Sequence, residues 1–281
     1  MTAPSLAGAL ARLAPVGLAE LVDRAALQTR VDRKYLVPSA ALPRLLERFA
    51  ADARVLDVDG ARSFRYQSVY FDTPGLLSYH RAAHRRRRRF KVRTRTYLDS
   101  AQCWLEVKVS GARGSTTKHR LPYRPGDRDA VRPGRDFVDE ALARESFDLR
   151  EGAALDPVLV TDYDRATLLL PGGASRVTVD TGLRWRAAGR ELRLPGLAVV
   201  ETKTASAATA VDRALWQEGT RPARISKYAT GLAALRVDLP AAPWRRTLRR
   251  HFQAAPTDHT PTTDHAATTD HAEVEQEASC A

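Results

Sequence analysis

Apolar and charged residues alternate along much of the middle of the chain. In residues 88–98, Phe90 and Val92 alternate with Lys91, Arg93 and Arg95, which is the period of a β-strand. Segments with strand character recur, with turn residues between them. They predict strands at residues 28–38, 64–74, 88–98, 103–111, 116–124, 157–170, 175–187 and 197–204. The close succession of the middle segments indicates antiparallel pairing.

Helical spacing appears before, between and after these strands. Residues 18–27 have the spacing of a helix, and a second helix is expected to open at Ser39 or Pro43. Residues 135–149 read as a helical insertion, and two further helices, near residues 208–219 and 226–235, end the ordered part. Strands and helices in this order predict an α+β fold.

Charged side chains share one face on several of the predicted strands. An acid and a lysine stand two residues apart at Asp32 and Lys34, at Glu106 and Lys108, and at Glu201 and Lys203. For one strand alone, a charged face pointing to water is the simpler interpretation. Because about seven strands share the pattern, we expect a closed sheet with a polar lumen and helices packed outside.

Composition limits the class of protein. The chain has 281 residues, 43% of them hydrophobic and 28% charged, with a mean hydropathy of −0.38, and these values are typical of a globular protein. We expect one domain over residues 1–252. Residues 253–281 contain a loose Thr/Asp/His repeat and further acids, which predicts a disordered tail.

The net charge of the chain is +12. Residues 253–281 contain six acids and no lysine or arginine, so residues 1–252 carry +18. A field of this size attracts polyanions, which include nucleic acids, acidic membrane surfaces, nucleotides and condensed phosphates. Net charge alone does not choose among them.

The cysteines and the hydrophobic segments bear on location. Cys103 and Cys280 have neither disulfide nor metal-ligand spacing, which favours a reducing cytoplasm. The N-terminal region lacks the apolar core of a secretory signal, and no segment reaches the roughly 20 apolar residues of a membrane span. We therefore expect a cytoplasmic protein without a membrane span.

A cationic lumen would need an anion inside it. Burial of an unpaired ion costs on the order of several kcal/mol. A lumen lined with lysine and arginine therefore favours a bound polyanion or a metal-bound anion. Glu106 and Glu201 carry hard oxygen ligands suited to Mg or Mn, which need only one or two carboxylates beside phosphate oxygens.

Eight motifs, in order, resemble the VTC domain of polyphosphate polymerases, a branch of the triphosphate tunnel metalloenzyme (CYTH-like) superfamily. They span residues 30–232 and are DRKYLVP, SVYFDTP, KVRTRTY, LEVKVSG, VTDYDR, RVTVDTGLR, VVETK and ISKY. The resemblance implies a closed eight-stranded antiparallel tunnel that binds a triphosphate along its lumen.

The resemblance also implies roles for individual residues. Catalytic phosphate contacts are expected from Lys34, Arg93, Arg95, Lys108, Arg165 and Lys227; substrate-binding contacts from Lys91, Lys118, Tyr163 and Ser226; and Mn or Mg ligation from Glu201 and Glu106. Asp32 departs from the glutamate that often precedes the first-strand lysine.

The expected reaction is transfer of the γ-phosphate of ATP to a growing polyphosphate chain. A triphosphatase of the same fold and a non-catalytic polyanion binder are the alternatives. Sparse aromatic residues around Arg85–Arg89 argue against nucleic acid as the partner, and we expect this arginine run at a tunnel mouth. Asp72 is expected to be a turn or helix cap. Asp180 and Arg184 fit a strand end at least as well as a tunnel wall.

Overall fold

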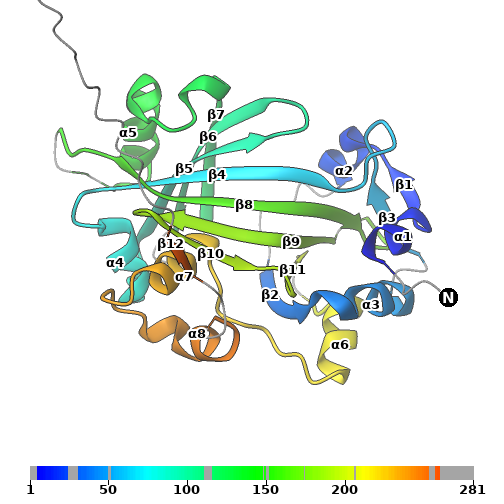
Figure 1. Cartoon of the computed structure of the whole chain (residues 1–281). Coiled ribbons are helices and arrows are strands. Elements are labelled where there is room, and N and C mark those ends of the chain that lie inside the picture. The colour runs from blue at the N-terminus through cyan, green and yellow to red at the C-terminus, as the bar shows by residue number, and fades with distance from the viewer. Residues whose placement is uncertain are drawn as a thin grey trace, which may run out of the picture.

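The computed structural model describes residues 5–24, 31–49, 52–110, 116–147, 149, 152–173, 175–205, 207–252 and 257–259. Figure 1 shows one large, strongly bent sheet with helices on its outer side and at one end. The fold is therefore α+β, as the alternation of strand and helix patterns predicts.

Eight strands form the main antiparallel sheet in the order β2–β11–β9–β8–β4–β5–β6–β7. Their bounds are Val31–Pro38 (β2), Phe64–Asp72 (β4), Arg89–Tyr97 (β5), Gln102–Ser110 (β6), Thr116–Tyr123 (β7), Asp156–Leu169 (β8), Arg176–Ala187 (β9) and Leu197–Thr204 (β11). Each corresponds to a segment with predicted strand character, and the bounds differ by a few residues.

The sheet is not closed, so the predicted closed barrel is corrected to an open, curved sheet. Within the described residues β2 pairs only with β11, and β7 pairs only with β6. The alternation of charged and apolar residues along a strand predicts which face of the sheet is polar. It does not predict whether the first and last strands of the sheet pair with each other. Closure depends on the summed twist and bend of every strand, and bulges at Tyr70/Phe71 and Asp162/Asp164 alter that bend locally.

Four short strands extend the sheet at its margins and were not predicted. Strands β1 (Ala14–Val16) and β3 (Arg54–Leu56) pair in parallel, and β3 joins the end of β8. Strand β10 (Arg190–Leu194) forms a hairpin with β9, and β12 (Thr257–His259) pairs with β10. Residues 257–259 belong to the tail predicted to be disordered; the rest of 253–281, with Cys280, lies outside the described residues.

The described helices are short. They are α1 (Leu6–Ala11), α2 (Leu18–Arg24), α3 (Leu42–Phe49), α4 (Leu77–Ala83), α5 (Arg135–Arg144), α6 (Ala210–Gln217), α7 (Lys227–Leu235) and α8 (Arg245–His251), with 3-10 turns at Ser39–Ala41, Pro125–Asp127, Arg132–Gly134 and Ala242–Trp244. Within the part of the chain that the structure describes, no helix is long and apolar enough to cross a membrane.

The apolar face of the sheet packs outward against helices, as predicted. Helices α1, α3 and α6 cover β2, β11, β9 and β8 through a core that includes Tyr35, Leu45 and Val200. Helix α5 covers β5 and β6 through a second core that includes Val92 and Val138. Burial of these side chains on the outer side leaves the opposite set of strand residues on the concave face.

Helix α7 closes one end of the concave face. Its buried residues pack with Tyr70, Leu159 and Trp185 of the sheet. Gly231 allows this approach, because a Cβ at this position would overlap the Trp185 ring. The Trp185 indole donates a hydrogen bond to the Lys227 carbonyl over 2.8 Å, which holds the first turn of α7 against β9.

Asp72 caps α4, as predicted. Its carboxylate accepts hydrogen bonds from the backbone N–H groups of Thr73, Ser78 and Tyr79 and from the Tyr228 hydroxyl. The side chain is fully buried, and burial raises its pKa although these hydrogen bonds lower it. One carboxylate thus ties the end of β4 to both α4 and α7.

Candidate functional site

The strand register places every predicted strand residue of the site on the concave face. On β5, Lys91, Arg93 and Arg95 alternate with the buried outer residues Phe90 and Val92. Across the sheet, Arg93 pairs with Tyr70 and Glu106, and Glu201 pairs with Lys34. Partners at one register position lie on the same face, so the charged sets of these strands are continuous.

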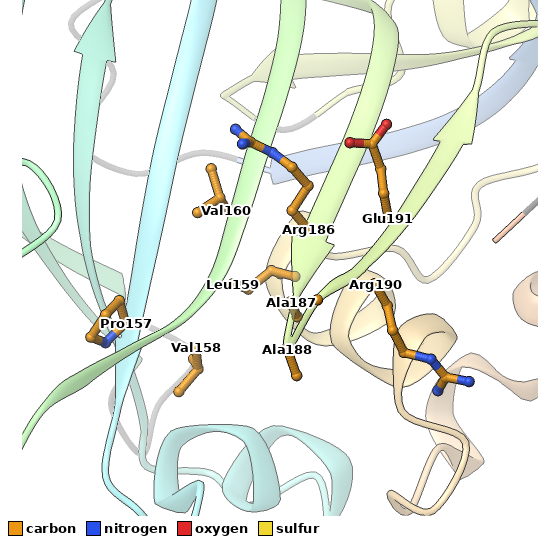
Figure 2. A pocket seen from close by; sticks show the side chains of 10 residues that line it. Pro157, Val158, Leu159, Val160, Arg186, Ala187, Ala188, Arg190 and Glu191 are labelled. Atoms are coloured by element: carbon orange, nitrogen blue, oxygen red, sulfur yellow. The ribbon is translucent and has the colours of Figure 1, made fainter. Parts of the chain in front are cut away.

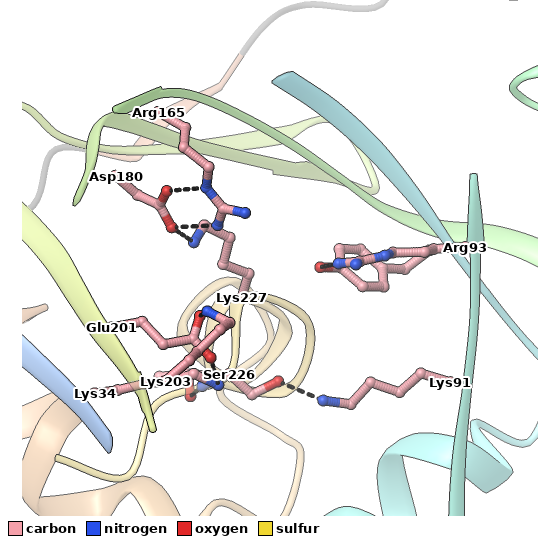
Figure 3. Close-up of polar contacts among 11 residues, drawn as sticks. Lys34, Lys91, Arg93, Arg165, Asp180, Glu201, Lys203, Ser226 and Lys227 are labelled. Atoms are coloured by element: carbon pink, nitrogen blue, oxygen red, sulfur yellow. Dashed lines mark hydrogen bonds and ion pairs between the residues drawn. The ribbon is translucent and has the colours of Figure 1, made fainter. Parts of the chain in front are cut away.

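The face is completed by residues from the remaining elements. The predicted residues lie on β2 (Lys34), β5 (Lys91, Arg93, Arg95), β6 (Glu106, Lys108), β7 (Lys118), β8 (Tyr163, Arg165), β11 (Glu201) and at the start of α7 (Ser226, Lys227). Figure 3 shows labelled side chains from β2, β11, β8, β9 and α7 on one side and from β5 on the other pointing toward a common space.

Glu106 lies at the centre of the first ion-pair cluster. Arg93 contacts its Oε2 at 2.6 Å, Arg95 lies 4.0 Å from the same atom, and Lys118 pairs with Oε1. Burial alone raises the pKa of Glu106, but the three cations lower it well below its usual value. Glu106 therefore carries a negative charge at neutral pH, and its oxygens are already occupied by cations.

Asp180 lies at the centre of the second cluster, although the sequence favoured a strand end at least as much as a tunnel wall for it and it was not among the predicted site residues. Arg165 donates two hydrogen bonds to its carboxylate, at 2.6 and 2.8 Å, and Lys227 pairs with the same carboxylate. Asp180 is fully buried, and although burial raises its pKa, these cations lower it overall. The alternation of Arg176, Thr178 and Asp180 is the signal that places it on the inner face.

Arg184 is not part of the concave face. Beyond the bulge at Asp162/Asp164 it pairs in register with Asp162, and its side chain is 42% exposed and lies near Glu191. The bulge reverses the alternation after Gly182, whose φ of 60° favours glycine. The interpretation of Arg184 as a strand-end residue is therefore the better of the two alternatives.

Glu201 lies at the centre of a third cluster. Its Oε1 is 3.8 Å from the Lys34 Nζ, and its Oε2 is 2.9 Å from the Lys203 Nζ. Lys203 was noted in the sequence as sharing the face of Glu201 but was not predicted as a site residue. Its side chain is 12% exposed, and burial lowers its pKa to about 8 despite the carboxylate beside it.

Lys91 joins β5 to the start of α7. Its Nζ donates a 3.0 Å hydrogen bond to the Ser226 hydroxyl, which also accepts from the Ala229 N–H as the N-cap of α7. Burial lowers the pKa of Lys91 strongly, and the cations Lys34 and Lys108 lower it further.

Several buried polar atoms on the concave face have no hydrogen-bond partner among the described residues. They are the hydroxyls of Ser68, Thr161, Tyr163 and Thr178 and the Nε of Arg95. Ser68 pairs in register with both Arg95 and Thr161, so three of these groups are neighbours on one face. Unpaired buried donors of this kind are rare and mark a place where a ligand or water accepts hydrogen bonds.

The concave face offers few carboxylates that could bind a divalent metal ion. In the described part of the chain, no group of three or more His, Cys, Asp or Glu side chains forms a metal cluster. Both oxygens of Glu106 are held closely, by Arg93 and Lys118, whereas in Glu201 Oε2 is held by Lys203 and Oε1 is paired only loosely with Lys34. Asp32 lies on the same face as Glu201, opposite Lys203. This set suits a Mg or Mn ion that takes its remaining ligands from phosphate and water.

A separate pocket of about 250 Å³ lies over β8, β9 and β10 (Figure 2). Its charged groups are Arg186, Arg190 and Glu191, and it contains none of the predicted site residues. Arg186 is paired with Asp162 at 3.0 Å, and Arg190 donates to the Leu235 carbonyl at 2.7 Å. Since these groups serve internal contacts, the candidate site is the concave face.

A family model described as "VTC domain" matches residues 29–236 of the chain. This range contains all of the predicted site residues. A search of curated protein sequences found no match.

Solved structures of limited similarity were also found. A putative adenylyl cyclase from Hippeastrum, described as having a dominant triphosphatase activity, is 14% identical with a TM-score of 0.45 over 76% of this chain and 99% of that one. A putative adenylate cyclase from Bacillus halodurans is 15% identical with a TM-score of 0.42 over 68% and 87%. One from Vibrio parahaemolyticus is 12% identical with a TM-score of 0.37 over 68% and 84%.

Proposed function

Because the chain belongs to the VTC domain family, we propose that it is a metal-dependent phosphotransferase that extends polyphosphate with the γ-phosphate of ATP. The observation that carries the proposal is the concave face, on which cations from strands across the sheet and from α7 surround unpaired buried donors. A linear triphosphate has both the charge and the oxygen atoms that such a face requires.

The reaction conserves the number of phosphoanhydride bonds. An oxygen of the terminal phosphate of the polyphosphate attacks the γ-phosphorus of ATP, the bond from that phosphorus to the β,γ-bridging oxygen breaks, and ADP leaves with the electron pair. Phosphoryl transfer needs in-line positioning and charge neutralisation more than covalent help from the protein. Accordingly, no Ser-His-Asp set is required.

The ion pairs of the free protein define what each cation does. Arg93 and Arg165 present guanidinium groups that fork onto phosphate oxygens, while Lys34, Lys118 and Lys227 act as point charges. Lys108, Arg95, Lys91, Ser226 and Tyr163 extend the same surface as further phosphate contacts. In the free protein Glu106, Asp180 and Glu201 neutralise these cations, and a bound phosphate competes with the carboxylates for them.

We assign Glu201 as the main metal ligand and Glu106 as the weaker candidate. A bound Mn or Mg ion would neutralise charge on the phosphate oxygens during transfer. Lys203 holds the Oε2 of Glu201 at 2.9 Å, but the Oε1 of Glu201 is 3.8 Å from Lys34. Both oxygens of Glu106 are closely paired, so the Oε1 of Glu201 is the more available to a metal. We expect the protein to work in the cytoplasm, where ATP and Mg are available.

Incubation of the pure protein with ATP and Mn, followed by sizing of the products on a gel, tests this function. Phosphate chains together with ADP are the expected products. Orthophosphate and ADP without chains would overturn the polymerase and assign a triphosphatase to the same face. A protein that binds tripolyphosphate but turns over no nucleotide would instead be a polyanion-binding module.

A further inference from the structure

Helix α8 carries four arginines that the site does not use. Arg245, Arg246, Arg249 and Arg250 are all exposed, whereas Thr247 on the opposite side of the helix is buried. Residues at positions i, i+1, i+4 and i+5 of a helix lie on one side of it, so the four guanidinium groups share the solvent-facing side. Residues 237–252 also lie beyond the part of the chain that matches the family model.

These arginines have no acidic partner among the described residues. None of them takes part in a salt bridge there, although many other arginines of the chain do. Residues 219–252 contain one acidic residue, Asp238, and its carboxylate pairs with Arg236 at 2.8 Å. A surface with several arginines close together and so little neutralisation has a strong attraction for a polyanion.

Helix α8 is joined to the edge of the candidate site. The Thr247 hydroxyl donates to the Arg224 carbonyl over 3.1 Å, so Arg224, which is also exposed, lies beside α8. Ser226, the N-cap of α7, follows Arg224 by two residues. On the other side of Arg224, the Ala223 N–H donates a hydrogen bond to the Lys34 carbonyl over 2.7 Å. One short loop therefore connects the cations of α8 to Lys34 and α7.

We propose that Arg224, Arg245, Arg246, Arg249 and Arg250, called here the α8 arginine patch, bind a polyphosphate chain outside the concave face. The position of the patch next to Lys34 and α7 lets one chain occupy the site and the patch together. The identity of this polyanion rests on the proposed function. Retention of the chain between additions would lengthen the products without speeding each transfer.

The chemistry of the patch favours polyphosphate over a single-stranded nucleic acid. Bases are held by stacking on exposed aromatic rings. The large hydrophobic residues exposed in the described part of the chain are Leu18, Val22, Val31, Val58, Leu98 and Val237, and none of these is aromatic. Guanidinium groups without stacking partners match a ligand made of phosphate alone.

The test compares full-length wild type with a variant in which Arg245, Arg246, Arg249 and Arg250 are each replaced by glutamine. Fluorescence anisotropy measures binding of a labelled polyphosphate of about 100 units and, by competition, of tripolyphosphate. We expect at least a tenfold loss of affinity for the long chain, unchanged affinity for tripolyphosphate, and a salt dependence of log K that is shallower by about 3. The initial rate of ATP consumption stays unchanged.

The matched control replaces Arg44, Arg124, Arg132 and Arg144, which are equally exposed but dispersed, by glutamine. This variant loses the same net charge and should bind the long chain like the wild type. Circular dichroism checks that both variants keep the fold; if the α8 variant does not, Arg249→Gln with Arg250→Gln is used, with a smaller loss expected.

Equal affinity of the α8 variant and the wild type for long polyphosphate would overturn the inference. Tighter binding of the patch to single-stranded DNA or to phosphatidylserine vesicles than to polyphosphate would also overturn it. These binding measurements do not depend on turnover, so failure of the polymerase assay and failure of the patch are distinguishable.

Discussion

At the scale of single residues, the concave face consists of cations neutralised by three carboxylates. Glu106, Asp180 and Glu201 each serve two or more cations, and burial of the carboxylates is tolerated because the cations lower their pKa values. The face nevertheless carries more cations than carboxylates. Under the proposed function, a phosphate chain binds by replacing carboxylate contacts.

Glu201→Gln is expected to reduce metal-dependent turnover by about 100-fold or more, because a neutral amide is a poor ligand for Mg or Mn. Binding of tripolyphosphate without metal should persist or strengthen, because Lys34 and Lys203 lose their carboxylate partner. Steady-state kinetics and calorimetry measure the two effects. Glu140→Gln, on the exposed side of α5, is the control and should leave both unchanged. Full turnover in Glu201→Gln would contradict the metal role.

The pH dependence of binding follows from two lysines. Burial lowers the pKa of Lys118 and of Lys203 to about 8, so both lose their charge as pH rises through 8 in the free protein. A bound polyanion stabilises the charged forms. The affinity for tripolyphosphate should therefore fall between pH 7 and pH 9.5, roughly, with proton uptake on binding. Calorimetry in buffers of different ionisation enthalpy measures this uptake, and an affinity independent of pH would contradict the prediction.

The same shifts have an opposite consequence for the stability of the free protein. The unfolded chain holds its lysine protons up to a pKa near 10.5, whereas the folded chain releases those of Lys118 and Lys203 near 8. Between these values the unfolded state binds more protons. This contribution makes the free energy of unfolding rise with pH through that window.

At the scale of elements, α7 is the part that completes the site. It brings Ser226 to Lys91 and Lys227 to Asp180, and it is seated by Trp185 and by the Asp72–Tyr228 contact. The strands supply the cationic face, and the position of α7 along that face sets where Ser226 and Lys227 lie. Close packing at Gly231 fixes this position.

Gly231→Ala is expected to destabilise the protein and to weaken phosphate binding. The new methyl group overlaps the buried Trp185 ring, and such overpacking costs about 1–3 kcal/mol, which exceeds the gain in helix propensity of about 1 kcal/mol. Denaturant unfolding measures the stability. Calorimetry measures the affinity for tripolyphosphate, which should fall because Lys227 is displaced. Gly126→Ala, where a Cβ meets nothing within 4 Å, is the matched control. If Gly231→Ala changed neither the stability nor the affinity for tripolyphosphate, the contact with Trp185 would not hold α7 in place.

At the scale of the whole molecule, the charge is the dominant feature. Residues 1–252 carry +18, and much of this charge lies on the concave face and on the α8 arginine patch. Mutual repulsion of these cations weakens the folded state, and a bound polyanion relieves it. The ligand should therefore stabilise the whole domain.

Tripolyphosphate is expected to raise the midpoint of thermal unfolding. At a concentration 100 times its Kd, a ligand that binds only the folded state adds about 2.7 kcal/mol. Differential scanning calorimetry measures the midpoint, and NaCl at the same ionic strength is the control, since screening alone does not occupy the site. An equal effect of both salts would contradict a specific phosphate site.

The sequence by itself determined the main strands and their polar faces, because side chains alternate along a strand with a period of two whatever its neighbours are. It also allowed the family to be recognised, and it placed Lys34, Arg93, Glu106 and Glu201 on polar faces. Asp72 was predicted as a cap because its turn chemistry is local.

The tertiary structure alone decided how these faces meet. Within the described residues β2 and β7 do not pair with each other, so the closed barrel is corrected to an open sheet. The structure also paired Asp180 with Lys227 of a distant helix. It also showed that Lys203, which the sequence places on the face of Glu201, is largely buried and pairs with this carboxylate. Such contacts depend on strand order, bulges and the seating of α7 on Trp185. These are sums over many long-range interactions, and no local pattern in the chain encodes them.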